Sequence, residues 1–410
     1  MHGGDTLWRS GAFHLAAGSI DLGGFVTVKF RFAVPAAVMT ALVGLAPATA
    51  AAPASKGPVR MNELQVIGTH NSYKREISEP EQAVYEAAIN KPGDYDQFLA
   101  YSHAPIAQQF DGQRVRGLEL DLFPDPQGGL YDQPLVRRAV GAGPLTDPAW
   151  QSTGIKVFHI ADLDYRTTCV RFVSCLAQVR AWSAANPGHV PLLIMLELKQ
   201  SDERAVQAGG VVAPPWDAMA LDALDAEIRS VFTERQMITP DDVRRRRLTL
   251  EQSVLRHGWP ALKKSRGKVT FLLDNDPGPI RDAYIAGRPN LERRVLFTNS
   301  RAGFQDAAFI KRNEPGDFNT EQIRELVRAG YLVRTRSDVP LTTVLSGDTT
   351  QLAAALASGA QLVSTDFPVP GMAARYDSDF VARLPRGAVA RCNPINARRH
   401  CRDRRLERAR

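Results

Sequence analysis

The feature that most constrains the fold is a theme that repeats between Leu64 and Phe367: a short run rich in apolar and β-branched residues, a polar residue at its end, and then a helical stretch. Several of these runs are apolar almost throughout, as expected of parallel strands that are covered on both faces. We identify eight, at Leu64–Thr69, Gly117–Phe123, Lys156–Ile160, Leu192–Leu198, Lys268–Leu273, Arg294–Thr298, Tyr331–Thr335 and Gln361–Thr365.

Amphipathic helical stretches lie between several of the runs, at Phe172–Ala185, Trp216–Phe232 and Thr320–Ala329, and Gly330 follows the last of them in the usual position after a helix. Eight strands that alternate with helices predict an α/β fold, a (βα)8 TIM-type barrel, regular or irregular, in a single catalytic domain. The alternative is an open doubly wound sheet, but no glycine-rich phosphate loop follows the first run. In a barrel of this kind, the chemistry belongs at the C-terminal ends of the strands.

Charge is distributed unevenly along the 410 residues, whose formal net charge is +7. The stretch from Arg386 to Arg410 holds nine Arg against Asp403 and Glu407, so it accounts for this excess and the rest of the chain is balanced. A nucleic-acid enzyme more often carries a basic stripe near its site, and we expect no nucleic-acid partner. We therefore separate a barrel at residues 51–385 from an Arg-rich C-terminal tail at residues 386–410, which is either a solvated terminus or a segment that recruits the protein to anionic lipid.

The N-terminal residues predict export. Residues 32–47 form an apolar run that follows two basic residues, and residues 48–50 read Ala-Thr-Ala, a small-x-small cleavage pattern. These features are typical of a secretory signal peptide, and the run is short for a membrane span. Residues 1–28 do not fit a signal peptide, which a start codon assigned too far upstream would explain, with Val28 as the initiator. We expect residues 1–50 to be removed and the mature protein to be secreted into the extracellular space.

The cysteines agree with export. Four cysteines fall into two close pairs, Cys169/Cys175 and Cys392/Cys401. Of the three possible connectivities, proximity favours the two local disulfides, and an oxidising compartment favours disulfides over buried free thiols. The spacings are not those of zinc ribbons or fingers.

Three carboxylates are candidate metal ligands. Glu119 and Asp121 are two residues apart on a predicted strand, so both point to the same face. If that face is the barrel interior, Glu197 adds a third carboxylate from another strand, and three such groups repel one another unless they are protonated or neutralised by a metal. Oxygen donors, with an amide oxygen from Asn71, suit Ca²⁺ or Mg²⁺ better than Zn²⁺. The alternative is that the carboxylates are surface acids.

Two histidines are candidate catalytic residues. His70 and His159 each lie at the end of a predicted strand, the first and the third. Two imidazoles beside a metal suit acid–base catalysis of phosphodiester cleavage, in which one removes a hydroxyl proton and the other protonates the leaving oxygen. Lys199, Arg334 and Arg336 are candidates for binding substrate phosphate or ring hydroxyls, with salt bridges inside the barrel as the alternative.

Four aspartates near strand ends are weaker candidates. Asp162 or Asp164 orients His159 or caps the next helix. Asp274 and Asp366 follow predicted strands directly, and we expect them to cap helices.

Four motifs, taken in order, resemble the catalytic half of phosphoinositide-specific phospholipase C, and especially the secreted calcium-dependent bacterial members of that superfamily. They are Thr69-His70-Asn71-Ser72-Tyr73, Gly117-Leu118-Glu119-Leu120-Asp121, Phe158-His159 and Leu196-Glu197-Leu198-Lys199. The resemblance spans Met61 to Pro370, and the four motifs together are specific although each alone is weak. It implies a phosphoric diester hydrolase whose catalytic histidines are His70 and His159.

The resemblance also implies a cofactor and a reaction. Asn71, Glu119, Asp121 and Glu197 would be ligands of Ca²⁺, with Mg²⁺ less favoured. In the family, the inositol 2-hydroxyl of phosphatidylinositol-type lipids attacks the phosphorus, which releases diacylglycerol and forms a cyclic inositol phosphate that is released or hydrolysed. The chain has no room for the accessory lipid-binding modules of eukaryotic members. We expect a phospholipid substrate at a membrane surface, no protein partner and a monomer.

Two other functions stay open. A glycerophosphodiester phosphodiesterase or a sphingomyelinase-D-like lyase also uses two histidines and an acidic metal cluster, although Arg-Gly typically follows the first histidine of glycerophosphodiesterases and Asn-Ser-Tyr follows it here. A non-catalytic lipid-binding barrel would have lost a histidine or a carboxylate, and none is missing.

Overall fold

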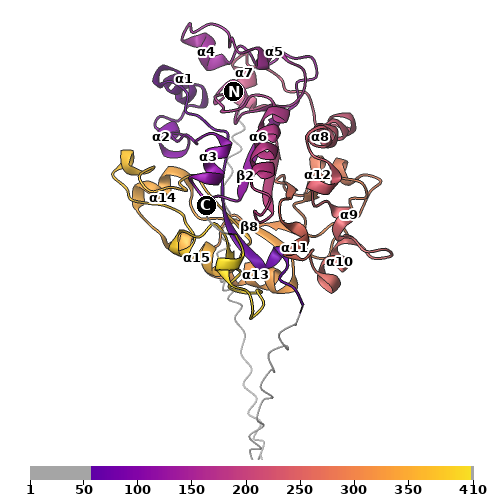
Figure 1. Ribbon diagram of the computed structural model, residues 1–410. Coiled ribbons are helices and arrows are strands. Elements are labelled where there is room, and N and C mark those ends of the chain that lie inside the picture. The colour runs from indigo at the N-terminus through magenta and orange to yellow at the C-terminus, as the bar shows by residue number, and fades with distance from the viewer. Residues whose placement is uncertain (1–56, 408–410) are drawn as a thin grey trace, which may run out of the picture. The chain divides into compact units, whose positions relative to one another are not determined.

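The computed structural model describes residues 57–407 (Figure 1), so the predicted signal peptide lies outside the described residues. Within them, eight parallel strands form a nearly closed barrel in the order β6-β5-β4-β2-β1-β9-β8-β7, and a parallel bridge between Asn299 and Phe309 links β6 to β7. The predicted (βα)8 barrel is confirmed. Its strands are β1 (Leu64–Thr69), β2 (Gly117–Phe123), β4 (Leu192–Leu198), β5 (Val269–Leu273), β6 (Leu296–Thr298), β7 (Phe309–Lys311), β8 (Leu332–Arg336) and β9 (Leu362–Thr365).

Helices connect most of these strands and surround the barrel (Figure 1). Before β4 they are α1 (Glu79–Ile89), α2 (Asp94–Phe98), α3 (Ile106–Asp111), α4 (Leu135–Ala139), α5 (Pro148–Gln151) and α6 (Phe172–Ala185). Between β4 and β6 they are α7 (Glu203–Gln207), α8 (Ala218–Val231), α9 (Pro240–Val243), α10 (Leu250–His257), α11 (Leu262–Ser265) and α12 (Pro279–Ile285). After β7 they are α13 (Asp317–Ala329), α14 (Pro340–Ser346) and α15 (Thr350–Ser358), and short 3-10 turns lie at Met61–Glu63, Glu234–Gln236, Ala374–Tyr376, Pro385–Gly387 and Asp403–Arg405. No helix of the described part is both long and apolar enough to cross a membrane.

The third predicted barrel strand is wrong. Only Lys156–Val157 of that run forms a strand, β3, and it pairs antiparallel to the C-terminal end of β2, with Val157 opposite Leu122. The missing barrel strand is β7, which sequence analysis did not find because it has three residues and no helix separates it from β6. The other seven predicted strands match barrel strands to within two residues at each end.

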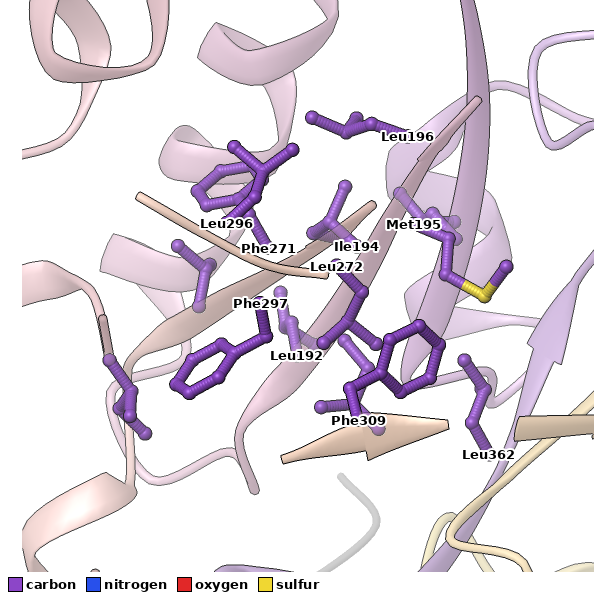
Figure 2. Close-up of a cluster of buried hydrophobic side chains, with 14 of the residues drawn as sticks. Leu192, Ile194, Met195, Leu196, Phe271, Leu272, Leu296, Phe297, Phe309 and Leu362 are labelled. Carbon is purple, nitrogen blue, oxygen red and sulfur yellow. The ribbon is translucent and has the colours of Figure 1, made fainter. Parts of the chain in front are cut away.

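The buried core explains why the strands are so apolar. Leucine, isoleucine, methionine and phenylalanine side chains of β4, β5, β6, β7 and β9 gather in one cluster (Figure 2). Inside the barrel, Gly68 of β1 lies beside Gly117, the first residue of β2, and a side chain on either glycine would collide with Leu362 of β9. This pair of glycines therefore gives Leu362 room inside the barrel.

The Arg-rich segment packs against the N-terminal end of the barrel. Strand β10 (Arg391–Cys392) pairs antiparallel with the first two residues of β1. The Arg116 guanidinium, just before β2, binds the Glu407 carboxylate, and both side chains are buried. Sequence analysis separates this segment from the barrel, whereas in the structure residues 391–407 close the end of the barrel opposite to the C-terminal ends of its strands.

Both predicted disulfides are present. One joins Cys169 to Cys175 at the start of α6, and the other joins Cys392 to Cys401 in the C-terminal segment. No described cysteine is left as a free thiol.

Candidate active site

Three of the four predicted metal ligands, the carboxylates, meet at the C-terminal end of the barrel. Glu119 and Asp121 lie on β2 and Glu197 lies on β4, where the strand register pairs Asp121 with Glu197. One oxygen from each carboxylate lies within 4.8 Å of the others. Glu119 also forms an ion pair with Arg334 of β8, at 2.8 Å. Because β2 and β8 are separated by β1 and β9, this ion pair crosses the barrel interior, and the carboxylates therefore face inward.

The carboxylates repel one another in a buried position. Burial raises the pKa of Glu119 to about 7, with Asp274 and Glu197 adding to the rise and Arg334 opposing it. Burial also raises the pKa of Asp121 well above its ordinary value, with Lys199 opposing the rise and Glu197 and Glu119 adding to it. Neither oxygen of Asp121 has a hydrogen-bond partner among the described residues. Three oxygen donors, one of them a buried carboxylate that meets the Lys199 ammonium at 3.3 Å without a hydrogen bond of good geometry, fit a hard divalent cation such as Ca²⁺.

Two of the predicted substrate-binding cations contact this carboxylate cluster. The Lys199 ammonium lies 3.3 Å from Asp121 Oδ2 and 3.2 Å from Glu197 Oε1. Arg334 is buried and, besides Glu119, donates to Ser364 Oγ and the Asn313 amide oxygen. The Lys199 side chain is partly exposed, whereas the guanidinium of Arg334 is hydrogen-bonded to protein groups.

His70 follows β1 and reaches the same cluster. Its Nε2 lies 3.4 Å from Glu119 Oε1, and its Nδ1 lies 2.9 Å from Asp366 Oδ1. Arg336 contacts the other oxygen of Asp366, at 3.3 Å. Burial and the Arg336 guanidinium lower the pKa of His70 to about 3, against the opposing effect of Asp366. The imidazole is therefore neutral at pH 7 and able to accept a proton.

His159 reaches the C-terminal end of β2 although it follows no barrel strand. Strand β3 pairs with β2, and the Phe158 backbone N–H donates to the Asp121 carbonyl at 3.3 Å. His159 Nδ1 lies 2.9 Å from Asp164 Oδ2. Burial lowers the pKa of His159, although the hydrogen bond to Asp164 opposes this.

Asn71 lies next to the cluster in a tight turn. It has a φ of 45°, in the left-handed region that asparagine tolerates better than most residues. Its amide oxygen accepts a hydrogen bond from the Tyr73 hydroxyl at 3.4 Å. Burial, with a contribution from the Asp121 carboxylate, raises the pKa of that hydroxyl. The following residue, Ser72, exchanges hydrogen bonds with the backbone of Glu119, so this turn is fixed to β2.

The sequence does not predict the roles of two acidic side chains near the site. Asp366 holds His70 instead of capping a helix, and Asp274 binds Lys311 of the undetected strand β7 at 2.9 Å. A signal for Asp366 was present, because β1 and β9 are parallel neighbours and residues that follow such strands meet at one edge. Of the two alternatives for His159, Asp164 is the residue that contacts it, while Asp162 accepts from the backbone of Leu135 and Val211.

The chain matches one described protein family over most of its length. The model of the family described as phosphoinositide phospholipase C, Ca²⁺-dependent, matches residues 59–394. No curated protein matches the chain.

The solved structures that match this chain include three bacterial enzymes. A calcium-dependent phosphoinositol-specific phospholipase C from a Pseudomonas species has a TM-score of 0.48 and 17% identity, over 83% of this chain and 97% of that one. A Ca²⁺-dependent phosphatidylinositol-specific phospholipase C from Streptomyces antibioticus has a TM-score of 0.45 and 17% identity, over 75% and 95%. A glycerophosphoryl diester phosphodiesterase from Parabacteroides distasonis has a TM-score of 0.27 and 10% identity, over 81% and 92%.

Proposed function

The chain belongs to the family of calcium-dependent phosphoinositide phospholipases C, and we propose that it cleaves phosphatidylinositol-type lipids to diacylglycerol and a cyclic inositol phosphate through two histidines. Membership makes the chain a phosphoric diester hydrolase of the calcium-dependent kind. The observation that carries the finer proposal is the position of His70, whose Nε2 lies 3.4 Å from Glu119 Oε1 at the carboxylate cluster. A proton acceptor thus lies beside the group that would hold the metal.

Asn71, Glu119, Asp121 and Glu197 would hold the calcium ion. When bound, the ion supplies positive charge that neutralises the phosphate and lowers the pKa of the attacking hydroxyl. Charged residues around the ligands would orient them or contact the substrate. Arg334 orients Glu119 from across the barrel, and Lys199 and Arg336, which are partly exposed, are the cations that we propose to contact the substrate phosphate or head group.

The two histidines would divide the proton transfers. Asp366 holds His70 by Nδ1, so Nε2 takes the proton from the inositol 2-hydroxyl as that oxygen attacks the phosphorus. Asp164 holds His159 by Nδ1, so Nε2 gives a proton to the glycerol oxygen as its bond to phosphorus breaks. An anionic phosphate next to His159 raises the pKa of the imidazole, which allows it to enter the reaction protonated.

Exposed apolar side chains support action at a lipid surface. Four of them lie on loops or first helical turns that follow barrel strands, namely Val212, Met219, Phe318 and Val339. Segments that follow barrel strands lie at the C-terminal end of the barrel, where the carboxylates meet. Met219 and Phe318 are 78% and 76% exposed. We propose that these four residues, the apolar rim, enter the lipid interface. The Arg-rich segment lies at the opposite end, so it would not bring the site to the membrane.

Export is part of the same proposal. Residues 32–50 have the pattern of a signal peptide, and the two disulfides are typical of proteins from oxidising compartments. We propose that the mature protein is secreted and acts as a monomer, with lipid as its partner.

Product analysis tests the proposed function. Vesicles of phosphatidylinositol are incubated with the protein, with calcium or with excess chelator, and diacylglycerol is measured. We expect release that requires calcium, and a loss of about 10²–10⁴-fold in His70→Ala, the range for general acid–base groups. Vesicles of phosphatidylcholine serve as the control for head-group dependence. Release of a free head-group alcohol, or release that continues with chelator, would contradict the proposal.

A further inference from the structure

A buried lysine, Lys74, lies at the end of the tight turn that begins at Asn71, and its backbone N–H donates to the Asn71 carbonyl at 2.8 Å. Lys74 is fully buried, and its Nζ donates to the Leu99 carbonyl at 2.7 Å. Lysine is almost never buried unless it is paired, because removing an ammonium group from water is costly. The carboxylate that pairs with Lys74 is Asp164, whose Oδ2 lies 3.2 Å from Nζ. A buried charge at this position indicates a functional role for Lys74.

Lys74 and His159 share the same carboxylate oxygen. Asp164 Oδ2 lies 3.2 Å from Lys74 Nζ and 2.9 Å from His159 Nδ1. The other oxygen, Oδ1, accepts from the Tyr95 hydroxyl at 3.3 Å and from Lys74 Nζ at 3.4 Å. With three partners around two oxygens, the Asp164 side chain cannot rotate without breaking a contact.

Two aromatic rings keep the ammonium in place. Lys74 Nζ lies 5.4 Å from the centre of the Tyr95 ring and 4.9 Å from that of Tyr101, within cation–π range. The Tyr101 hydroxyl lies 3.4 Å from Nδ1 of His70 and accepts from the Asn71 amide at 3.1 Å. The enclosure of Lys74 is therefore built from side chains that also contact the other half of the site.

We propose that Lys74 is a positioning residue: its ammonium fixes the Asp164 carboxylate, and Asp164 holds the His159 imidazole by Nδ1. The inference rests on the proposed function, in which His159 is the proton donor. Lys74 itself is enclosed by protein and touches no substrate. Its main effect on the reaction is through the Asp164 carboxylate, with a smaller direct effect of its charge on the imidazole, and both can be measured separately from general stability.

The charges around His159 give the proposal a measurable consequence. The charged groups that influence the imidazole are Asp164, Lys199 and Lys74. Although burial alone would raise it, the pKa of Asp164 is held below its ordinary value, first of all by Lys74. An ionised Asp164 accepts from Nδ1–H and leaves Nε2 for the substrate. Without Lys74, the Asp164–His159 pair takes up a proton more readily, so its apparent pKa rises.

The test is Lys74→Met, which keeps the length of the side chain and removes its charge. Nitrogen-15 NMR of the imidazoles, followed through a pH titration, reports the apparent pKa of the His159 pair without turnover. We expect a rise of about one unit or more. We also expect kcat on phosphatidylinositol to fall about 10- to 100-fold, which is less than for loss of the imidazole itself, with little change in KM. The limb of the pH–rate profile that is due to His159 should move by the same amount as the NMR titration.

Arg116→Met is the matched control. It also breaks a buried ion pair, but at the opposite end of the barrel. We expect it to lower the melting temperature and leave both the His159 titration and the pH–rate profile unchanged. A Lys74→Met protein that loses activity only in parallel with stability, with the His159 titration unmoved, would overturn the inference.

A second comparison covers the case in which Lys74→Met fails to fold. Lys74→Met combined with Asp164→Asn leaves neither charge uncompensated, and it is compared with Asp164→Asn alone. If Lys74 acts through Asp164, the added substitution changes kcat less than about twofold, because residues that act as a unit are not additive. A further tenfold loss would refute the inference. A wild-type protein that cleaves no inositol lipid would remove the proposed function, while the NMR titration would still decide the role of Lys74.

Discussion

His70 Nδ1 lies 2.9 Å from Asp366 Oδ1, although 296 positions separate the two residues in the sequence. The contact follows from the sheet, because β1 and β9 are parallel neighbours whose register pairs Thr69 with Thr365. The residues that come next along each strand are therefore placed side by side. One carboxylate thus fixes the ring of the histidine that we propose as the general base.

Asp366→Asn tests this relationship. We expect kcat to fall about 10²-fold or more with little change in KM, because an asparagine amide can donate to Nδ1 and favour the tautomer whose Nε2 cannot accept a proton. Steady-state kinetics on phosphatidylinositol vesicles measure the effect, with Asp282→Asn, an exposed aspartate of α12, as the control. Wild-type kinetics in Asp366→Asn would show that the ring of His70 needs no such partner.

Calcium affinity is expected to fall as the pH falls. Without metal, burial and neighbouring carboxylates raise the pKa of Glu119 to about 7 and that of Asp121 well above its ordinary value. A protonated carboxyl group is a poor calcium ligand, so below pH 7 binding must first remove a proton. Titration calorimetry at pH 8 and pH 6 should show affinity at least about tenfold weaker at pH 6, with proton release on binding. Equal affinity at both values would mean that the carboxylates are ionised before calcium binds.

Lys199→Met is expected to bind calcium more tightly and to turn over more slowly. The substitution removes a positive charge that lies 3.3 Å from Asp121 and 3.2 Å from Glu197, so the remaining cluster attracts a cation at least about tenfold more strongly. At saturating calcium, kcat should fall because the substrate phosphate loses a cationic partner. Lys311→Met, which removes a lysine paired with Asp274, is the control for charge alone. Unchanged or weaker calcium binding in Lys199→Met would contradict this account.

The apolar rim is expected to matter only at an interface. Met219→Ala combined with Phe318→Ala should lower cleavage of phosphatidylinositol vesicles about tenfold, because each side chain contributes apolar area that leaves water on insertion. Cleavage of a soluble monomeric substrate should not change. Arg399→Gln combined with Arg404→Gln, at the opposite end of the barrel, should leave vesicle cleavage intact. If the arginine variant loses vesicle cleavage and the rim variant keeps it, the protein binds lipid through its C-terminal segment.

The sequence was most informative where local pattern and fold coincide. Continuous apolar runs predicted β1, β2 and β4 with their observed bounds, and the alternation around Glu119 and Asp121 placed both on one face. Strand β7 is not predicted because Phe309–Lys311 is short and no helix separates it from β6. The sequence predicts His159 at the end of a barrel strand, and that reason is wrong. Strand β3, which precedes His159, pairs antiparallel with β2 and is not part of the barrel.

Contacts between distant segments were the least predictable part of the site. Nothing in the local sequence pairs Asp366 with His70 or Arg334 with Glu119, because these contacts depend on strand order and on the closing of the barrel. The same holds for Arg116 and Glu407, whose ion pair attaches a segment that composition alone describes as a charged tail.

The central claim is tested most directly by phosphorus-31 NMR of phosphatidylinositol incubated with the protein. The spectrum separates a cyclic inositol phosphate from an open-chain phosphate and from the intact lipid, and so reports the reaction and its product together. We predict a cyclic phosphate signal that grows with calcium, disappears with a chelator and is absent in His70→Ala. Formation of an open-chain phosphate with no cyclic species at any time, or a cyclic signal that persists with chelator, would contradict the account.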